Sequence, residues 1–129
     1  MIVDTSALVA IHDGESDAAE LFEKLRHQPD LKISAGTLLE TAIVLDGRQP
    51  GRTSRRLDRL VRDLRIVVVP TDAEQVRVAR AAYRDFGRGS GHPAKLNFGD
   101  CFAYALASAT GEPLLFKGDD FAHTDVRVG

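Results

Sequence analysis

The sequence predicts an α/β fold in which a central parallel β-sheet is flanked by α-helices. Two observations lead to this prediction. Short apolar runs, often β-branched, alternate along the chain with longer segments of helical periodicity. The apolar runs are continuous rather than alternating with polar residues, as in strands that helices cover on both faces. Because neither a repeat nor a linker divides the pattern, we expect residues 1–129 to form a single domain.

The expected strands are short and apolar. They cover residues 1–3, 31–34, 66–70 and 113–116. The third of them, IVVVP, is the strongest strand signal in the chain, because its β-branched residues are continuous and end at a proline.

Helical segments are expected between and after these strands. Thr5 and Ser6 form the turn into the first helix, and Thr71 with Glu74 fits a capping box that opens a later one. The other expected helices cover residues 17–28, about 37–46, a stripe at 57–64, and the small-residue segment 97–111. The segment GRQPG, residues 47–51, is expected to break the chain between two of them.

The composition is that of a soluble globular protein, with 43% apolar and 28% charged residues. The net charge of −2 gives no evidence for nucleic-acid binding by itself, and no apolar run approaches the length of a membrane helix. The first residues lack the basic start and cleavage site of a signal peptide, so we expect a cytoplasmic protein. Cys101 is the only cysteine, which excludes an internal disulfide and a cysteine-rich zinc site.

Acidic residues recur where the expected strands end. Asp4 follows the first strand, Glu40 lies early in the helix after the second, and Asp100 lies near the start of the last helix. Asp119 and Asp120 follow the fourth strand. The carboxyl ends of parallel strands meet at one edge of a sheet, so we expect these acids to cluster there. Clustered carboxylates repel one another, and a hard cation such as Mg²⁺ or Mn²⁺ relieves that repulsion.

The acids also have structural interpretations. Thr37 with Glu40 fits a capping box, Asn97 with Asp100 fits a similar cap, and the aspartate pair beside Gly118 fits a plain turn. The aspartate after the first strand is hardest to explain in this way, because a strand end beneath helices offers a charge little solvent. It is the conjunction of acids at one sheet edge that favours a functional site.

Four motifs resemble those of the PIN-domain ribonucleases, and most closely the VapC-type toxins of type II toxin–antitoxin pairs. They are MIVDTSALVA, ISAGTLLE, LNFGDCFAYALA and LLFKGDDF, in family order and at family-like spacing over nearly the whole chain. The resemblance implies a PIN-like fold and Mg²⁺- or Mn²⁺-dependent hydrolysis of RNA phosphodiesters. Many relatives have D-x-D in the last motif, whereas this chain has Gly118 followed by two aspartates, so either Asp119 or Asp120 could face the metal.

The resemblance also assigns roles to individual residues. Asp4 and Asp100 are the expected metal ligands, and Glu40 is expected to act through water, as a second-metal ligand or as the base that orients the nucleophile. Asp119 and Asp120 share the remaining catalytic position. Residues expected to support these acids are Thr5, Ser6 and Asn97, the last either by orienting Asp100 or as a helix cap.

Basic residues gather in two places. Seven arginines crowd one short span and could bind phosphates, although a solvated helix face offset by nearby aspartates explains them better. The span carries Arg48, Arg52, Arg55, Arg56, Arg59, Arg62 and Arg65. The glycine-rich loop at residues 87–95, with Arg88 and Lys95, is better placed to meet RNA because it directly precedes the Asp100 motif.

The resemblance further implies a VapB-type antitoxin partner. Such a partner would lay an apolar helix in a groove and place a basic side chain near the acids. We expect that groove at residues 16–26 and 39–45, with homodimerisation through other helix faces.

Two other functions fit parts of the sequence. A noncatalytic PIN-like module that binds RNA or protein would share the fold, but all the acids are present. A haloacid-dehalogenase-type phosphatase also begins with an aspartate after a first strand. That chemistry requires a second aspartate two residues later, where this chain has Ser6, and a later lysine for which Lys117 is poorly placed.

Overall fold

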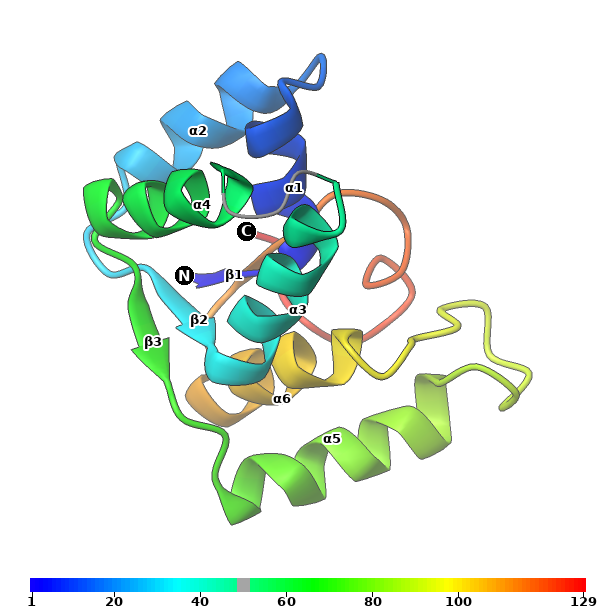
Figure 1. Cartoon of the computed structure of the whole chain (residues 1–129). Helices are drawn as coiled ribbons and strands as arrows, with labels where there is room; N and C mark the ends of the chain where they lie inside the picture. Colours follow the sequence, from blue (N-terminus) through cyan, green and yellow to red (C-terminus); the bar gives the residue numbers. More distant parts are fainter. Residues whose placement is uncertain (49–51) are drawn as a thin grey trace.

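The computed structural model of the chain describes residues 1–48 and 52–129 (Figure 1). In this part of the chain four parallel strands form one sheet in the order β3-β2-β1-β4. The strands are β1 (Ile2–Val3), β2 (Lys32–Ser34), β3 (Val67–Val69) and β4 (Leu114–Leu115). The parallel sheet expected from the continuous apolar runs is therefore confirmed.

Helices cover both faces of the sheet. They are α1 (Thr5–Asp13), α2 (Ala18–Arg26), α3 (Ala35–Asp46), α4 (Arg52–Asp63), α5 (Ala73–Phe86) and α6 (Asp100–Thr110). In β1, Val3 belongs to an apolar core shared with α1 to α4, whereas its neighbour Ile2 belongs to a second core shared with α5 and α6. Because successive strand residues face opposite sides, two residues in each of β1 and β4 supply both cores.

The strand with the strongest sequence signal lies at the edge of the sheet. β3 pairs only with β2 in the described sheet, and Val67 and Val68 are 57% and 42% exposed. The run of β-branched residues correctly predicted a strand. It did not predict the position, because strand propensity reflects a pleated, half-buried surface rather than a central place.

The capping box expected at Thr71 and Glu74 is wrong by one residue. Asp72 is the N-cap of α5, and its carboxylate accepts a hydrogen bond of 2.9 Å from the Gln75 amide. The Thr71 hydroxyl instead lies 3.1 Å from the hydroxyl of Ser34 at the end of β2. The cap therefore forms with the stronger of two adjacent capping side chains.

The arginine-rich span includes α4, with Arg48 before the helix and Arg65 after it. Arg55, Arg56, Arg59 and Arg62 are exposed on this helix, as expected for a solvated face. Arg48 forms an ion pair with Asp13 at the end of α1. The chain break expected at GRQPG falls largely on residues 49–51, outside the described residues.

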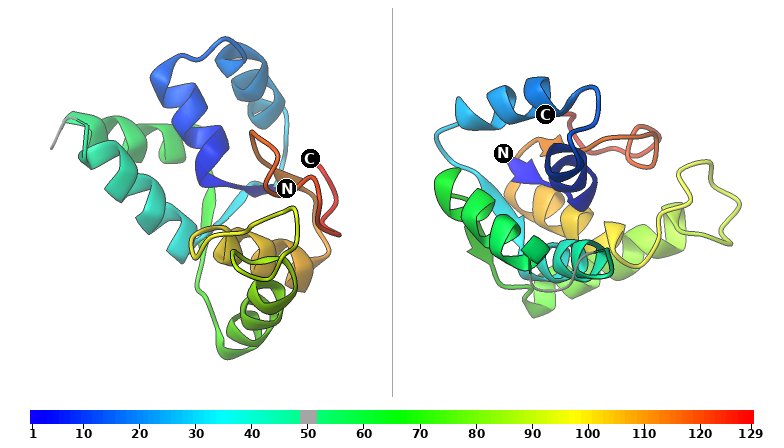
Figure 2. Two further views of the ribbon diagram at one scale, coloured as in Figure 1. Left: turned by 90° about the vertical axis from the view of Figure 1, so that its right-hand side faces the viewer. Right: turned by 45° about the horizontal axis from the view of Figure 1, so that its top comes forward.

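The C-terminal segment returns to the sheet after a long loop. Val128 forms a parallel bridge with Leu114 of β4, and the Gly129 amide donates to the Leu114 carbonyl at 2.8 Å. The two ends of the chain consequently lie near each other in all views (Figure 2). Among residues 1–48 and 52–129, no helix has the length and apolar character needed to cross a membrane.

Candidate active site

Asp4 lies directly after β1 and caps the start of α1. One carboxylate oxygen, Oδ2, accepts hydrogen bonds from the Ser6 amide at 2.9 Å and from the Ser6 hydroxyl at 2.6 Å. The other oxygen, Oδ1, is buried and has no hydrogen-bond partner among the described residues. Asp4 itself is only 3% exposed. A buried, unpaired carboxylate oxygen is costly, and it is a free ligand atom for a cation.

Asp100 is the first residue of α6, and Asn97 fixes its position. The Asn97 amide donates to Asp100 Oδ2, and the Asp100 amide donates to Asn97 Oδ1, both at 2.9 Å. This reciprocal pair is the predicted cap. The same two hydrogen bonds therefore cap the start of α6 and orient the Asp100 carboxylate.

Glu40 is not a helix-capping residue. Helix α3 begins at Ala35, so the predicted box with Thr37 is wrong and Glu40 lies in the second turn. Its Oε1 accepts a hydrogen bond of 2.6 Å from the Thr5 hydroxyl. A Cβ atom at Gly99 would come within 1.5 Å of Glu40 Oε2, so glycine allows this carboxylate to lie against the backbone before α6.

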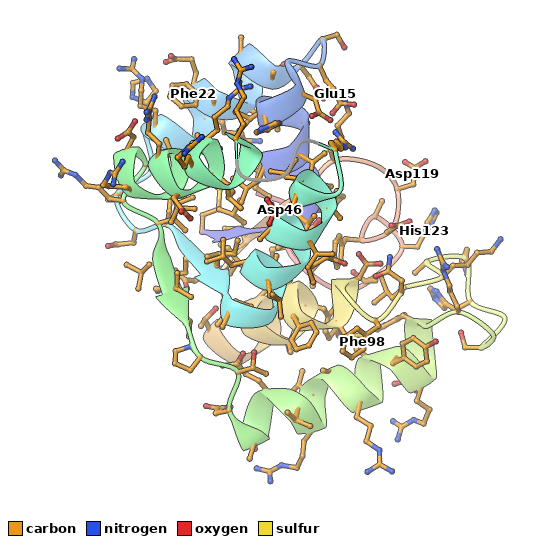
Figure 3. All side chains as sticks on the ribbon, viewed as in Figure 1. Glu15, Phe22, Asp46, Phe98, Asp119 and His123 are labelled. Carbon is orange, nitrogen blue, oxygen red and sulfur yellow. The ribbon has the colours of Figure 1, made fainter. Side chains whose placement is uncertain are left out.

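The two aspartates after β4 are placed differently. Gly118, with φ of +97°, turns the chain just before them. Asp120 lines the same cleft as the other acids, and its charge contributes to raising the pKa of Asp100. Asp119 lies outside the cleft lining and points outward from the loop (Figure 3). The structure thus brings together four of the five predicted acids.

These four acids line a cleft of about 270 Å³ at the carboxyl ends of β1 and β4, which we call the acid cleft. All three predicted supporting residues line it too. The complete lining is Asp4, Thr5, Ser6, Val9, Glu40, Val44, Asn97, Asp100, Lys117, Asp120 and Phe121. Arg88 and Lys95 are exposed on their loop and do not line the cleft.

Lys117 lines the acid cleft, although no sequence pattern predicted a role for it there. Of the described residues it is the only basic one that lines the acid cleft. Its amide donates to the Ser6 hydroxyl at 2.9 Å, and that hydroxyl in turn donates to Asp4. Its ammonium group turns to Asp17 at 2.9 Å and Glu15 at 3.4 Å, away from the four acids.

Burial and mutual repulsion raise the pKa values of the two deepest acids. Burial is the main cause for Asp4, and the negative charge of Glu40 adds to it, against the lowering effect of the bonds from Ser6. Burial also raises the pKa of Asp100 to about 7, and the charges of Asp4, Asp120 and Glu40 contribute. The acid cleft therefore resists full ionisation until positive charge is supplied.

The residues fit a hard divalent cation. Among the described residues, no three acidic, histidine or cysteine side chains already stand close enough to hold an ion jointly. Mg²⁺ needs no such cage, because it binds through one or two carboxylates and keeps several waters. The unpaired Oδ1 of Asp4 and the oxygen-rich lining meet that requirement.

Comparison with known proteins places the chain in a family. The model of the PIN domain family matches residues 1–127. The chain belongs to the PIN-domain family. Ribonuclease VapC42 of Mycobacterium tuberculosis is 56% identical over 127 residues, which cover 98% of this chain and 97% of that protein. Ribonuclease VapC of Mycolicibacterium smegmatis is 48% identical over 128 residues, which cover 98% of this chain and 97% of that protein.

Solved PIN-domain structures share the fold at much lower identity. The M. tuberculosis toxin VapC20, described as cleaving the sarcin–ricin loop, superposes with a TM-score of 0.75 and 18% identity over 97% of this chain and 95% of its own. The VapBC2 structure of Rickettsia felis, bound to a promoter DNA fragment, superposes with a TM-score of 0.76 and 14% sequence identity. The match covers 99% of this chain and 96% of the chain in that structure. At these identities the likeness establishes the fold alone.

Proposed function

We propose that this PIN-domain protein is a metal-dependent endoribonuclease and the toxin of a type II toxin–antitoxin pair. The observation that carries the proposal is the acid cleft, where four carboxylates from separate segments face one another and two have raised pKa values. The relatives named VapC ribonucleases, at up to 56% identity over nearly the whole chain, support the same activity.

In this proposal Asp4 and Asp100 hold Mg²⁺ or Mn²⁺. Asp4 offers its unpaired Oδ1, and Asn97 keeps Asp100 aimed into the cleft. The bound cation would polarise the scissile phosphate and lower the pKa of an attacking water. Ser6 keeps Asp4 oriented through two hydrogen bonds, which leaves the opposite oxygen free for the cation.

Glu40 and Asp120 complete the proposed catalytic set. Thr5 donates to Glu40, and Thr41 in turn donates to the Thr5 hydroxyl at 2.9 Å, so this carboxylate is fixed within a chain of hydroxyls. A carboxylate held in this way can orient a water molecule and accept its proton. Asp120, two residues after the Gly118 turn, can approach the cation from the other wall of the cleft.

The proposed partners are RNA, a VapB-type antitoxin and a second copy of the chain, all in the cytoplasm. Arg88 and Lys95 are the proposed RNA backbone contacts beside the cleft. The groove expected between residues 16–26 and 39–45 needs revision, because Leu21 and Phe22 of α2 pack against the core. The exposed apolar side chains of the predicted groove therefore lie on α3.

No observation favours the two alternatives. A noncatalytic module has no need of four clustered acids, two of which, Asp4 and Asp100, have raised pKa values. For the phosphatase, the position that requires a second aspartate holds Ser6, whose hydroxyl is used by Asp4 and the Lys117 amide.

The deciding experiment is RNA cleavage by the purified chain under control of divalent metal. We expect cleavage with Mg²⁺ or Mn²⁺, loss on chelation, recovery on readdition, and weak activity with Ca²⁺, whose looser coordination holds water less well. An Asp100→Asn preparation made in parallel controls for contaminating ribonuclease. Undiminished cleavage in excess chelator would contradict the proposal.

A further inference from the structure

The side chain of Lys117 joins the loop after β4 to the connection between α1 and α2. Its ammonium group donates to Asp17 Oδ1 at 2.9 Å and lies 3.4 Å from Glu15 Oε2. The hydrogen bond between them raises the pKa of Lys117 and lowers the pKa of Asp17, which favours the ionised form of both. Two segments that are 100 positions apart in the sequence are thereby held together.

Asp17 contacts this lysine instead of capping its own helix. It occupies the N-cap position of α2, where an aspartate normally accepts a hydrogen bond from an amide of the first turn. Its side chain makes no such bond among the described residues, whereas the aspartates that cap α1 and α5, Asp4 and Asp72, both do. The contact with a distant cation therefore indicates a role for Asp17 beyond the stability of α2.

The connection that holds the ammonium group is itself fixed to the end of α1. The Glu15 amide donates to the carbonyl of Ala10, in the last turn of that helix, at 3.1 Å. Figure 3 shows Glu15 at this turn between α1 and α2. Asp4 caps the start of the same helix. Helix α1 thus connects a proposed cation ligand at one end with the anchor for Lys117 at the other.

The backbone of Lys117 contacts the start of α1. Its amide donates to the Ser6 hydroxyl at 2.9 Å, so the hydroxyl uses its single proton for Asp4 Oδ2, at 2.6 Å. Oδ2 is then satisfied, and Oδ1 is left without a hydrogen-bond partner among the described residues. Because the amide and the ammonium group belong to one residue, holding the ammonium group also restricts the position of the amide.

The loop that follows Lys117 is anchored at its other end by Phe121. This side chain is 2% exposed, and its ring centroid lies 5.2 Å from that of Phe116. Asp120 lies between the two anchors and lines the acid cleft. The ion pairs of Lys117 therefore restrict the position of Asp120 as well as that of the amide.

We propose that Lys117 is a positioning residue of the ribonuclease, whose ion pairs with Asp17 and Glu15 keep its amide where it directs Ser6 toward Asp4. The proposal rests on the ribonuclease function proposed above. Lys117 affects the cation only through Ser6 and Asp4, and its ammonium group does not act on the RNA. The three paired side chains are 34% to 43% exposed, and ion pairs with this exposure are weak. We therefore expect their loss to change cation binding by about fivefold rather than to abolish it.

The first test measures the dissociation constant of Mn²⁺ by electron paramagnetic resonance, without RNA. Lys117→Met should weaken Mn²⁺ binding by about fivefold. Charge alone predicts the opposite change, because loss of a cation near four carboxylates strengthens their attraction for Mn²⁺. Mn²⁺ binding by Lys117→Met that is as tight as in the wild type, or tighter, would overturn the inference.

Two further variants control for charge and for the substitution itself. Lys117→Arg keeps a cation that can pair with both acids, so it should bind Mn²⁺ like the wild type. Lys24→Met is the matched control, because Lys24 is also exposed on the surface but donates to the Gly129 carbonyl instead. It should leave Mn²⁺ binding unchanged. An equal loss in Lys24→Met would assign the effect to any lost lysine and would overturn the inference.

The second test removes the other side of the ion pairs. The variant Glu15→Gln/Asp17→Asn should weaken Mn²⁺ binding by about as much as Lys117→Met, and the two sets of changes combined should weaken it no further, because they break the same contact. RNA cleavage should fall in both. If the ammonium group acted on RNA directly, its release from two acids would raise cleavage, and that result would overturn the inference.

Hydrogen exchange of the residue-117 amide tests the geometry in the metal-free protein. We expect slow exchange in the wild type and in Lys117→Arg, and exchange about fivefold faster in Lys117→Met. Unchanged exchange in Lys117→Met would show that the ion pairs do not position the amide, and would overturn the inference. If the wild type cleaves no RNA but Mn²⁺ binding and amide exchange change as expected, the ribonuclease proposal fails while the positioning role of Lys117 stands.

Discussion

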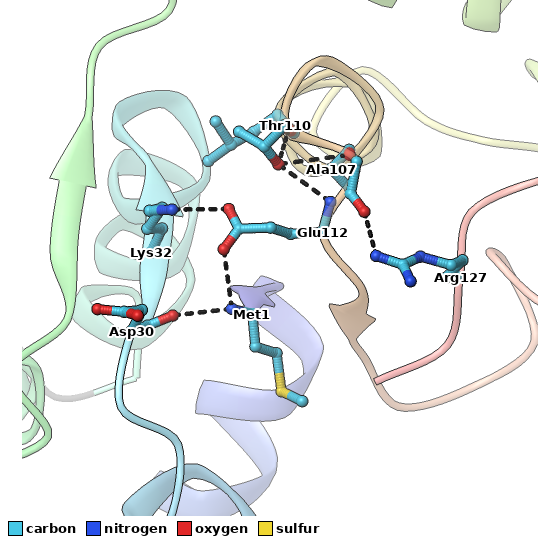
Figure 4. Close-up of polar contacts among 9 residues, drawn as sticks. Met1, Asp30, Lys32, Ala107, Thr110, Glu112 and Arg127 are labelled. Carbon is cyan, nitrogen blue, oxygen red and sulfur yellow. Dashed lines mark hydrogen bonds and ion pairs between the residues drawn. The ribbon is translucent and has the colours of Figure 1, made fainter.

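The acidic residues at the two ends of the parallel sheet have opposite electrostatic environments. At the amino ends of the strands, the Glu112 carboxylate lies 2.8 Å from the Lys32 ammonium and 3.3 Å from the amino group of Met1 (Figure 4). Burial alone would raise the pKa of Glu112, but these two hydrogen-bonded cations outweigh it and lower the pKa. The charge of Glu112 is therefore neutralised, and its two ion pairs link the amino ends of β1, β2 and β4.

At the carboxyl ends, four acids share one cleft and the pKa of Asp100 rises to about 7. The only lining cation among the described residues, Lys117, turns to Glu15 and Asp17 instead. One end of the sheet is therefore arranged for stability, whereas the other keeps unbalanced charge that a ligand must relieve. Repulsion between acids that the folded protein leaves uncompensated lowers its stability, and such a loss of stability is typical of functional sites.

The largest expected effect comes from removing one charge at the carboxyl end. Asp100→Asn should reduce RNA cleavage by about 10²–10³-fold or more, because it removes a proposed cation ligand. The same change should raise the free energy of unfolding of the metal-free protein by about 1–2 kcal/mol, because it relieves repulsion and the amide oxygen can still accept from Asn97. Cleavage assays and urea denaturation measure both effects. A variant that is less stable than the wild type would contradict the contrast between the two ends.

The aspartate pair after β4 tests whether the position of a carboxylate in the acid cleft, and not only its charge, determines the rate of cleavage. Asp120→Asn should lower cleavage by about 10–10²-fold, whereas Asp119→Asn, one residue away and outside the cleft, should leave the rate unchanged. The two variants remove the same charge from the same loop. If their rates fell equally, the loop would act through its net charge and the placement of Asp120 would be irrelevant.

Orientation of Asp4 through Ser6 can be tested separately from charge. Ser6→Ala removes a hydroxyl that accepts from the Lys117 amide and donates to Asp4, but it keeps all four acids. We expect cleavage to fall by about 10-fold, with part of the loss recovered at high Mg²⁺ because the defect weakens cation binding. A rate that metal concentration does not affect would assign Ser6 a different role.

The stability of the metal-free protein should depend on pH with a defined sign. Between about pH 4 and 7 folded Asp100 keeps a proton that the unfolded chain has lost, so the free energy of unfolding falls as pH rises, by at most about 1.4 kcal/mol per unit. Urea denaturation across this range measures the slope. Asp100→Asn should make the slope shallower by removing this contribution and leaving that of Asp4, whose pKa is also raised, and added Mn²⁺ should reverse the slope by favouring the ionised acids. An unchanged slope in the variant would locate the titrating group elsewhere.

The smallest effect is expected at the amino end. Glu112→Gln should lower the free energy of unfolding by about 1 kcal/mol and leave cleavage unchanged, because it removes a neutralised acid far from the cleft. Glu23→Gln is the matched control, since Glu23 pairs with Arg26 on an exposed helix surface and its loss should cost less. Stabilisation by Glu112→Gln would mean that both ends of the sheet are strained.

Local patterns in the sequence were enough to predict the parallel sheet, the helices on both faces and the segments that bring acids to one edge. Asp4 after a buried strand and the Asn97–Asp100 cap depend on neighbours a few residues apart, so they can be read from the chain. The position of β3 at the edge could not, because an apolar run specifies a strand without specifying its neighbours.

The remaining features depend on contacts between distant segments. The true partner of Glu40 is Thr5, 35 residues away, and no local pattern distinguishes that contact from a cap. The presence of Asp120 rather than Asp119 in the cleft lining depends on the path of the loop after β4, which turns at Gly118, and no local pattern specifies that path. The exposure of Phe98 was equally hidden, because an aromatic residue before a helix normally indicates core.

The hydrogen bond from the Lys117 amide to Ser6 joins residues 111 positions apart. A ribosome makes the amino end first, so Asp4 and its helix emerge long before the loop that steadies them. Until that loop and Asp120 have been synthesised, a nascent chain lacks one wall of the cleft. We therefore expect an interrupted translation product that lacks this wall to cleave no RNA, so that activity would arise only when synthesis of the chain is nearly complete.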